Sequence, residues 1–336
     1  MKAVNIKLAV VGATGLVGRT MLEVLEDRKV AVEELIPIAS PKSRGASVQF
    51  GGRDWSVSTL EDDPWRRADA ALLSAGANVS RQWVPKLAEA GVVCIDNSSA
   101  FRQDDGVPLV VPEVNREAIQ KGNQIIANPN CSTIQLVMVL APLDRTFGLD
   151  EVVVATYQSA SGIGQKGKVR LLEETSAKAS GLSPFPHPLF ENLIPGIGPL
   201  REGEYYFEEW KLVHETRKIL GSPSLRIYPT AVRVPVPHCH GEAVHLRFKD
   251  DVDPVQARQI LSSSPGLQVV DDPENDRYPL PLSCRGRDEV FVGRIRQMPG
   301  ETQTLDLWIV ADNLRKGAAT NAVQILEFVL QSGWIG

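Results

Sequence analysis

The side chain best suited to chemistry in this sequence is the thiol of Cys131, which lies in the segment Asn-Pro-Asn-Cys-Ser-Thr of residues 128–133. Apolar residues predict a strand over residues 124–127, and a helical pattern follows over residues 132–146. A cysteine at the start of a helix lies near the positive end of the helix dipole, which lowers its pKa and favours the thiolate. Cys131 is therefore the candidate nucleophile, whereas Cys94 and Cys284 are expected to be ordinary buried thiols.

A glycine-rich loop near the N-terminus is the second chemical signal. Gly12, Gly15 and Gly18 separate an apolar run over residues 6–11, typical of a buried parallel strand, from a helical pattern that continues to about residue 27. Glycines between a strand and a helix permit a tight turn and let a phosphate approach the helix N-terminus. The spacing is GxxGxxG rather than GxGxxG, so a plain structural turn is the alternative interpretation.

The residues after the second predicted strand indicate which dinucleotide the loop would bind. NAD enzymes usually carry a carboxylate about 20 residues beyond the glycine loop. Here Ser40 stands 22 residues after Gly18, and Lys42, Ser43 and Arg44 follow it without a carboxylate. Hydroxyl groups and cations suit a 2′-phosphate, so the sequence favours NADP over NAD. The alternative is a solvated basic surface loop.

These residues need a scaffold, and the first third of the chain predicts one in which strands alternate with helices. This pattern is typical of a parallel, doubly wound sheet of the Rossmann type. The strands are expected at residues 6–11, 35–39, 70–73, 92–96 and 124–127, with helices between them at residues 80–90 and 114–121.

The remainder of the chain is expected to form an α+β domain with a mostly antiparallel sheet. Its helices are expected at residues 132–146, 167–180 and 208–220, and its strands at residues 151–158, 225–228, 231–236, 240–248, 289–297 and 304–311. The turn at residues 298–301 should join the last two strands as a hairpin. Residues 181–204 are rich in proline and glycine, and so long a loop is usually functional or an interaction arm.

Length and composition limit the possible classes of protein. The 336 residues suggest about two domains, predicted as residues 1–132 with a returning helix over 315–336, and residues 133–314. The net charge of −5 speaks against a nucleic-acid partner, and no apolar stretch approaches the ~20 residues of a membrane span. Four scattered cysteines predict neither a disulfide framework nor a metal site. No export signal precedes the first strand, so a cytoplasmic location is expected.

Taken together, the motifs resemble those of the aspartate-β-semialdehyde dehydrogenase family over essentially the whole chain. The similarity lies in residues 12–18, 74–76, 96–102, 128–133, 156–162, 208–211, 233–236 with His240, and 312–319. The resemblance implies NADPH-dependent reduction of L-aspartyl-4-phosphate to L-aspartate 4-semialdehyde with release of phosphate. This reaction leads toward lysine, threonine, methionine and diaminopimelate. The resemblance also implies small-molecule substrates, a cysteine acyl-thioester, which divides one hard step into easier ones, and a homodimer formed through the second domain.

The resemblance also assigns roles to single residues. Cys131 is the nucleophile, His240 the general acid/base and Gln158 the residue that orients the acyl intermediate. The implied substrate-binding residues are Arg102 and Lys211 for the phosphate, Arg233 for the carboxylate, Glu208 for the ammonium group, and Asn130. The implied cofactor-binding residues are Gly12, Thr14, Gly15, Leu16, Val17, Ser40, Lys42, Ser43, Ser161, Gly162 and Asn313. Without the family, a simple ion pair between Glu208 and Lys211, three apart on a helix, would be the preferred interpretation.

The sequence leaves a choice between His238 and His240 for the general acid/base. They are two apart on a predicted strand, so both could project to one face. The resemblance favours His240, which lies seven residues after Arg233 as in the family, and Pro237 predicts a strand break near His238. Glu242, two residues further on, is expected to help orient the ring of His240.

Two other functions remain open at this point. A related acyl-thioester reductase such as a malonyl-CoA reductase would share Cys131 and His240, but a malonyl group has no ammonium for Glu208 to bind. A catalytically silent paralogue that acts as a binding protein would have the same fold, although such a protein typically loses its nucleophile.

Overall fold

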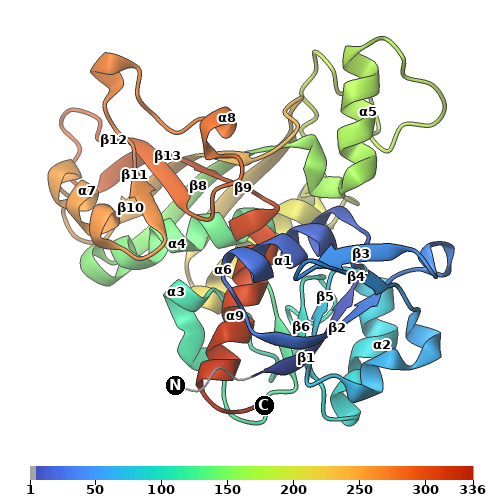
Figure 1. Ribbon diagram of the computed structural model, residues 1–336. Helices are drawn as coiled ribbons and strands as arrows, with labels where there is room; N and C mark the ends of the chain where they lie inside the picture. The colour runs from blue at the N-terminus through green and yellow to red at the C-terminus, as the bar shows by residue number, and fades with distance from the viewer. Residues whose placement is uncertain (1–4, 336) are drawn as a thin grey trace. The chain divides into compact units, whose positions relative to one another are not determined.

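The computed structural model describes residues 5–335. Within them the chain forms two compact units: the first runs to Asn130 and resumes at Ala318, and the second spans Cys131–Gly317 (Figure 1). The sequence predicts a division after residue 132 and a return at residue 315. The observed division places Cys131 at the start of the second unit.

The first unit is built on the predicted parallel sheet. Its strands run in the order β2-β1-β5-β6-β7. They are β1 (Ile6–Val11), β2 (Val32–Ile38), β5 (Ala70–Leu73), β6 (Val93–Asp96) and β7 (Ile125–Ala127). The main helices of this unit are α1 (Leu16–Asp27), α2 (Ala77–Glu89) and α9 (Thr320–Gln331). A π-helical turn over Arg315–Ala319 leads into α9, which is why the last helix begins later than predicted.

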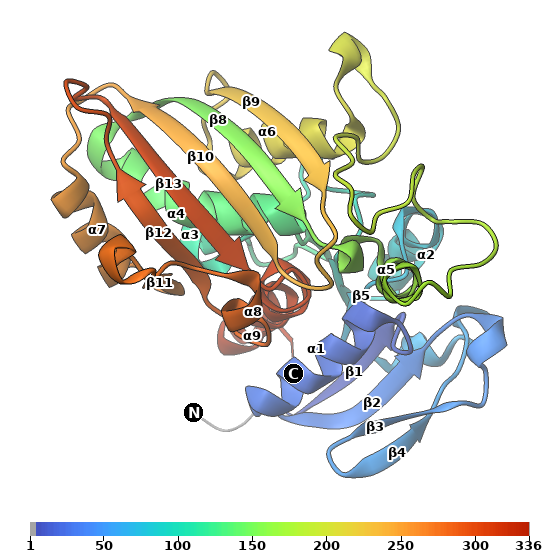
Figure 2. The same ribbon diagram turned by 90° about the horizontal axis from the view of Figure 1, so that it is seen from above.

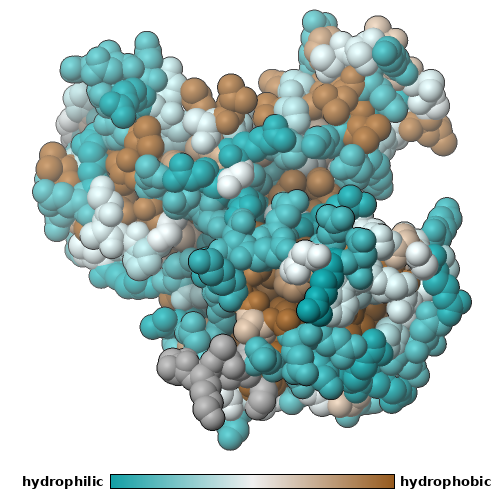
Figure 3. All heavy atoms as spheres, in the orientation of Figure 1, coloured by the Kyte–Doolittle hydropathy of each residue, from teal (hydrophilic) through white to brown (hydrophobic). Residues whose placement is uncertain are grey.

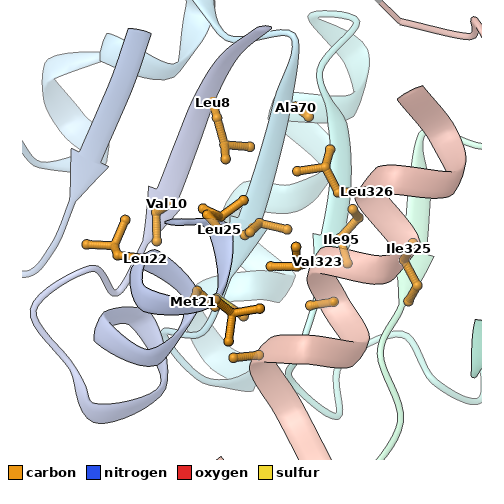
Figure 4. Packing of buried hydrophobic residues seen from close by; sticks show 14 of the residues in the cluster. Leu8, Val10, Met21, Leu22, Leu25, Ala70, Ile95, Val323, Ile325 and Leu326 are labelled. Carbon is orange, nitrogen blue, oxygen red and sulfur yellow. The ribbon is translucent and has the colours of Figure 1, made fainter. Parts of the chain in front are cut away.

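The core of the first unit follows the alternation of side chains along its strands. Leu8 and Val10 of β1 point to one face, where they pack with Met21 of α1 and Leu326 of α9 (Figure 4). The intervening residues of β1 belong to a separate buried cluster that includes Trp83 of α2. Burial on both faces explains why β1 is a nearly continuous apolar run in the sequence. It also shows that the returning C-terminal helix completes the first unit.

The second unit contains a six-stranded sheet in the order β11-β12-β13-β10-β8-β9. Three of its strand pairs are antiparallel, while β8 with β9 and β11 with β12 are parallel. The strands are β8 (Leu149–Gln158), β9 (Arg226–Arg233), β10 (His240–Phe248), β11 (Leu267–Val269), β12 (Val290–Arg296) and β13 (Thr304–Ala311). The helices are α4 (Cys131–Phe147), α5 (Gln165–Thr175), α6 (Phe207–Leu220), α7 (Pro254–Ser263) and α8 (Pro281–Cys284). Helix α4 packs against β8, β10 and β13 and lies behind them in Figure 2.

One predicted strand boundary in this sheet is wrong. The sequence predicts separate strands at residues 225–228 and 231–236, whereas β9 is continuous over Arg226–Arg233 and includes Pro229. Proline lacks an N–H and usually interrupts a sheet, but it is tolerated on an edge strand. Because β9 is the edge strand and pairs only with β8 in this sheet, Pro229 leaves no internal hydrogen bond unmade.

The helix predicted over residues 114–121 is only partly present. The chain forms the single turn α3 (Pro112–Asn115), followed by a 3-10 turn over Arg116–Ala118. The Asn115 side chain accepts a hydrogen bond from Val111 N and donates one to Leu109 O, each over 2.9 Å. Side-chain bonds of this kind compete with helical backbone bonds and stop the helix.

Two pieces of local structure escaped prediction. The strands β3 (Ser47–Phe50) and β4 (Arg53–Ser56) form a hairpin in the first unit. Gly51 and Gly52 connect them with φ angles of +60° and +70°, as a type I′ turn requires. In the second unit, α7 and β11 lie in a stretch for which no element was predicted.

The predicted turn at residues 298–301 is confirmed, since Glu301 N donates to Met298 O over 3.0 Å and Gly300 has a φ of +90°.

Helix α5 is shorter than predicted and carries exposed apolar residues. It ends at Thr175 rather than at residue 180, because Ala177 adopts a left-handed conformation and Lys178 N closes the helix on Glu173 O. Figure 3 shows hydrophobic atoms gathered around α5 and the loop that follows it. The exposed apolar side chains of this region are Val169, Leu172, Leu182, Phe190 and Leu193.

Among the described helices of the whole chain, none is long and apolar enough to cross a membrane.

Candidate active site

The topology of the second sheet brings several predicted site residues to one edge. Strands β8 and β9 are parallel and end in register at Gln158 and Arg233. Strand β10 is antiparallel to β8, so it begins at this same edge, with His240. His240 pairs with Ala311 at the end of β13, and Asn313 follows two residues later. Residues distant in the sequence therefore converge because four strand ends share one edge.

Cys131 is the first residue of α4, as the sequence predicts, and its side chain is half-buried. Its helical position favours the thiolate, and the positive charge of Arg233 interacts with it. Gly317 lies against it: a Cβ atom at Gly317 would stand 3.0 Å from Cys131 Cβ. A glycine at this position therefore leaves the room that the thiol needs.

The other three cysteines have a different environment. Cys94, Cys239 and Cys284 are buried, and burial raises the pKa of each thiol, in the case of Cys284 to about 11. A thiol with a raised pKa is a poor nucleophile at neutral pH. Of the four cysteines, Cys131 is the one whose setting suits covalent chemistry.

His240 is fully buried, and its ring is oriented by one neighbouring residue. Ser159 N donates to His240 Nδ1 over 3.1 Å, and Ser159 Oγ lies 3.2 Å from the same atom. A backbone N–H can only donate, so Nδ1 is the acceptor and the ring proton of the neutral histidine resides on Nε2. Within residues 5–335, Nε2 has no hydrogen-bond partner. Burial, together with the charge of Arg233, lowers the pKa of His240 to about 3, so its ring is neutral.

Arg233 lies beside this histidine and is also buried. Its Nη1 donates to Ser159 O over 2.6 Å. Burial lowers the pKa of Arg233, and the negative charges of Glu208 and Cys131 oppose that shift. Gly162 packs directly on this group, since a Cβ there would lie 2.6 Å from Arg233 Nη1 and 3.4 Å from His240 Nε2. Gly162 therefore keeps space open next to both side chains.

Glu208 connects two of the other predicted residues. Its Oε2 pairs with Lys211 Nζ at 2.7 Å, within the first turn of α6. Its Oε1 accepts a hydrogen bond of 3.2 Å from Gln158 Nε2, which also lies 3.3 Å from Thr156 Oγ1. The ion pair that spacing alone predicts is present, but both residues are mostly buried and linked to Gln158, unlike a surface pair.

Ser161 and Asn313 lie next to the histidine. Asn313 Nδ2 donates to Ser161 Oγ over 3.1 Å, and Asn313 Oδ1 accepts from Cys239 N over 3.0 Å. Ser159 Oγ lies 3.0 Å from Ser161 Oγ, which joins this pair to His240. The structure thus brings the residues expected near the nicotinamide together with the residues expected to do chemistry, all within the second unit.

Arg102 and Asn130 belong to the first unit and are buried there. Arg102 Nε donates to Asn128 O over 2.9 Å, and its Nη2 donates to Asn97 O over 2.8 Å. Asn97 directly follows β6, and Asn128 directly follows β7. The guanidinium is therefore fixed at the carboxyl ends of two parallel strands, where open α/β sheets bind their ligands.

The glycine loop has the backbone geometry of a dinucleotide site. Gly12 has a φ of +89°, and a Cβ there would lie 2.8 Å from Ser74 Oγ. A Cβ at Gly18 would approach Gly12 O to 2.1 Å, so only glycine allows α1 to pack this closely on the loop. The first turn of α1 carries no acidic side chain to compete with a phosphate. These features fit the pyrophosphate of a dinucleotide at the helix N-terminus.

The residues predicted to contact the second phosphate lie beside this loop. Thr14 Oγ1 is 3.4 Å from Ser43 Oγ, which places the loop after β2 against the glycine loop. Ser40 and Lys42 are exposed there. Arg44 forms an ion pair with Asp62, so its charge is already engaged within the protein. A ligand at this loop would compete with Asp62 for Arg44, which favours Lys42 as its cation.

The structure also separates the two candidate histidines. Strand β10 begins at His240, and Cys239 before it has a φ of +68°, so the predicted break between them is present. His238 precedes the strand and experiences the charges of Lys168, Arg285 and Asp312 rather than those of the site. The two rings therefore do not share one strand face.

The expectation that Glu242 orients His240 is wrong. The bonds to His240 Nδ1 come from Ser159, whereas the Glu242 carboxyl has no hydrogen-bond partner of ordinary geometry within residues 5–335. Sequence reasoning gave no role to Ser159 or to Gly317. Ser159 stands inside the segment of residues 156–162 that carries the family resemblance, which was the available signal for it.

Comparisons with known proteins agree across both units. The family described as semialdehyde dehydrogenase, NAD binding domain, matches residues 7–122, and the semialdehyde dehydrogenase dimerisation domain matches residues 140–316. The aspartate-semialdehyde dehydrogenase of Aquifex aeolicus is 46% identical, over 98% of this chain and 99% of the relative.

Solved structures give the same result. Aspartate semialdehyde dehydrogenase II of Vibrio cholerae, complexed with ASA, superposes with a TM-score of 0.94 at 42% identity, covering 98% of this chain and 99% of that chain. The Candida albicans enzyme with NADP gives 0.78 at 26% identity, covering 99% of this chain and 100% of that one. Similarity of this extent over both units shows that the chain belongs to the aspartate-semialdehyde dehydrogenase family.

Proposed function

We propose that this protein reduces L-aspartyl-4-phosphate to L-aspartate 4-semialdehyde and phosphate with NADPH, through an acyl-thioester on Cys131. The observation that carries the proposal is the grouping of Gln158, Arg233 and His240 at one edge of the second sheet, where the charge of Arg233 interacts with a cysteine that begins a helix. Family membership supports the same reaction, which serves amino-acid biosynthesis. The names of the relatives do not favour a malonyl-CoA reductase.

The first chemical step is attack of the Cys131 thiolate on the acyl carbon. The carbon–sulfur bond forms as the carbon–oxygen bond to phosphate breaks, and inorganic phosphate leaves with the bonding electron pair. The helix N-terminus and the charge of Arg233 stabilise the thiolate. Because burial keeps His240 neutral, the thiolate depends on these two groups rather than on a charged histidine.

His240 acts on the oxygen of the reacting carbonyl. Its Nε2 carries the proton and has no protein partner among the described residues, so it is available to donate to that oxygen as negative charge develops. Gln158, fixed by Glu208 and Thr156, positions the acyl group. Once the acyl carbon has accepted a hydride, return of electrons from the oxygen breaks the carbon–sulfur bond, expels the thiolate and releases the aldehyde.

A nicotinamide dinucleotide, when bound, supplies the hydride that reduces the thioester. Residues that would hold it are Gly12, Thr14, Gly15, Leu16 and Val17 of the glycine loop, with Ser161, Gly162 and Asn313 for the nicotinamide. The finer choice of NADP rests on Ser40, Lys42 and Ser43, which offer hydroxyl groups and a cation where NAD enzymes usually place a carboxylate.

The remaining residues recognise the charged groups of the substrate. Glu208 would receive the ammonium group, and Arg233 would bind the carboxylate through its planar fork. Lys211 and Arg102 would contact the phosphate, with Asn130 beside the nucleophile. The acidic overall charge of the chain is compatible with an anionic substrate because these cations are local.

We also propose a homodimer formed through the sheet face opposite α4. The family match over residues 140–316 is described as a dimerisation domain. On that face of the sheet, Val153, Tyr157 and Tyr228 are between 36% and 47% exposed, and Tyr157 packs on Trp308. Exposed apolar residues gathered on one sheet face are typical of a protein interface.

The test is a coupled measurement of substrate and cofactor. The purified protein should oxidise NADPH with aspartyl phosphate, and in reverse should reduce NADP with aspartate semialdehyde only when phosphate is present. Cys131→Ala is the matched control and should be inactive in both directions. Turnover of malonyl-CoA in place of aspartyl phosphate would contradict the proposed substrate, and absence of all turnover would indicate a silent paralogue.

A further inference from the structure

A buried polar pair lies behind the nucleophile and has no role in the reaction as described. Glu242 in β10 and Gln135 in α4 are both fully buried. Among residues 5–335, neither carboxyl oxygen of Glu242 and neither amide atom of Gln135 has a hydrogen-bond partner of ordinary geometry. Burying such groups without full partners costs stability, so their presence needs a reason other than stability.

Their position relates the pair to the catalytic residues. Gln135 lies four residues after Cys131, which places it one turn further along the same face of α4. Glu242 lies two residues after His240, on the same face of β10. The next positions on this face, such as Val154 and Val244, are buried and apolar. The polar pair is therefore confined to the layer next to the site.

The described neighbours of Glu242 bring no charge to it. Across β10, its partner on β8 is Thr156, and its partner on β13 is Ile309. Helix α4 contributes Gln135, with the Cys131 thiol one turn away. Burial raises the pKa of Glu242 well above its usual range, and Gln135 opposes this shift only in part. Full burial without a cationic partner favours the uncharged form of this carboxyl, which has one O–H to donate.

An uncharged acid and an amide are complementary. The acid O–H can donate to Gln135 Oε1, while the amide N–H donates to the acid carbonyl; a carboxylate could only accept. Thr156, directly opposite Glu242, already accepts from Gln158 Nε2 over 3.3 Å. Opposed side chains of an antiparallel pair lie within contact of each other. One layer thus connects the helix of the nucleophile to the strands of Gln158 and His240.

We propose that Glu242, together with Gln135, is a positioning residue: as a neutral acid it fixes the first turns of α4 against the strands that carry Gln158 and His240. This inference rests on the proposed function. It explains a polar pair in an apolar layer, and it explains why the acid must stay uncharged. A carboxylate there would place a negative charge behind Cys131 and disfavour the thiolate.

The test compares two substitutions of Glu242. Glu242→Gln keeps the shape and one donor, so kcat should stay within about 3-fold of wild type. Glu242→Leu fills the space without polar atoms, so the protein should fold, but kcat should fall at least 10-fold with KM changed less than 3-fold. The matched control is Val244→Ala, which opens a cavity on the same face and should lower Tm without lowering kcat.

Two further measurements separate positioning from other roles. Gln135→Leu should reproduce the loss of Glu242→Leu, and the double variant should be no worse than either, because the pair acts as one unit. The pH dependence of Cys131 alkylation by iodoacetamide should give the same thiol pKa in wild type and Glu242→Gln. That assay needs no substrate, so it tests the inference even if wild type shows no turnover of aspartyl phosphate, which would refute the proposed function alone.

Wild-type kcat in Glu242→Leu would overturn the positioning role. A Glu242→Gln variant as impaired as Glu242→Leu would show that the carboxyl acts as a charge. A fall of about one unit in the Cys131 pKa in Glu242→Gln would lead to the same conclusion, since removing a nearby negative charge favours the thiolate.

Discussion

The burial of His240 predicts a specific dependence of stability on pH. Burial, together with the charge of Arg233, lowers the pKa of His240 to about 3, whereas an unfolded histidine titrates near pH 6.5. Between these two values the unfolded chain binds one more proton than the folded protein. The stability contributed by neutral His240 is therefore complete above pH 6.5 and is lost as the pH falls toward 3.

The size of the effect follows from the two pKa values. Linkage gives a loss of about 2 kcal/mol between pH 7 and pH 5, and about 4 kcal/mol by pH 3, where the folded histidine itself becomes half protonated. A His240→Gln variant lacks the titrating group, so its stability should fall less over the same range. For each protein, the free energy of unfolding is plotted against pH. The difference between the slopes of wild type and His240→Gln separates the contribution of His240 from that of the carboxylates that also titrate in this pH range.

The assay is urea unfolding at pH 7, 6 and 5, with the free energy of unfolding extrapolated to water at each pH. The control is His187→Gln, which makes the same substitution at an exposed histidine. Equal slopes for wild type and His240→Gln would refute the buried, neutral histidine. That result would also remove the reason for assigning thiolate stabilisation to Arg233.

The remaining predictions concern activity and assembly. Cys131→Ala should abolish turnover while still binding NADP, measured by fluorescence titration, and iodoacetamide should modify Cys131 before the buried cysteines. Lys42→Ala should raise the KM for NADP by about 10-fold more than that for NAD, whereas Arg44→Ala, whose charge is paired with Asp62, should change their ratio little. His238→Gln should change kcat only a few-fold, against a loss of about 10²–10⁴ for removal of the general acid/base. Val153→Arg should give a monomer by analytical ultracentrifugation, because it places a charge on the exposed sheet face.

The first unit could be predicted well because its signals are local. Buried parallel strands appear in the sequence as runs of apolar residues, and the glycine loop marks the first turn from a strand to a helix. Its strand pattern was therefore recovered, although Gly51 and Gly52 offered an equally local hairpin signal that the prediction missed. The failure at residues 114–121 is different, because it arises from side-chain bonds of Asn115 to its own backbone neighbourhood.

The second unit was harder because its features depend on tertiary position. Pro229 interrupts a strand only if the strand has neighbours on both sides, and the sequence does not reveal that β9 lies at an edge. The role expected of Glu242 failed for a similar reason. The alternation of side chains along a strand places Glu242 on the same face as His240. Only the folded turn after β8 shows that Ser159 N already donates a hydrogen bond to His240 Nδ1.

Ser159 shows why the chemistry of this site depends on backbone geometry. Its N–H fixes the tautomer of His240, and its carbonyl oxygen accepts from Arg233, so one peptide segment aligns the proton donor with the cation that supports the thiolate. Its hydroxyl extends the network to Ser161. Backbone atoms make the first two bonds, so they depend on the course of the turn rather than on the serine side chain. The guanidinium can lie against this turn because Gly162 has no Cβ to displace it.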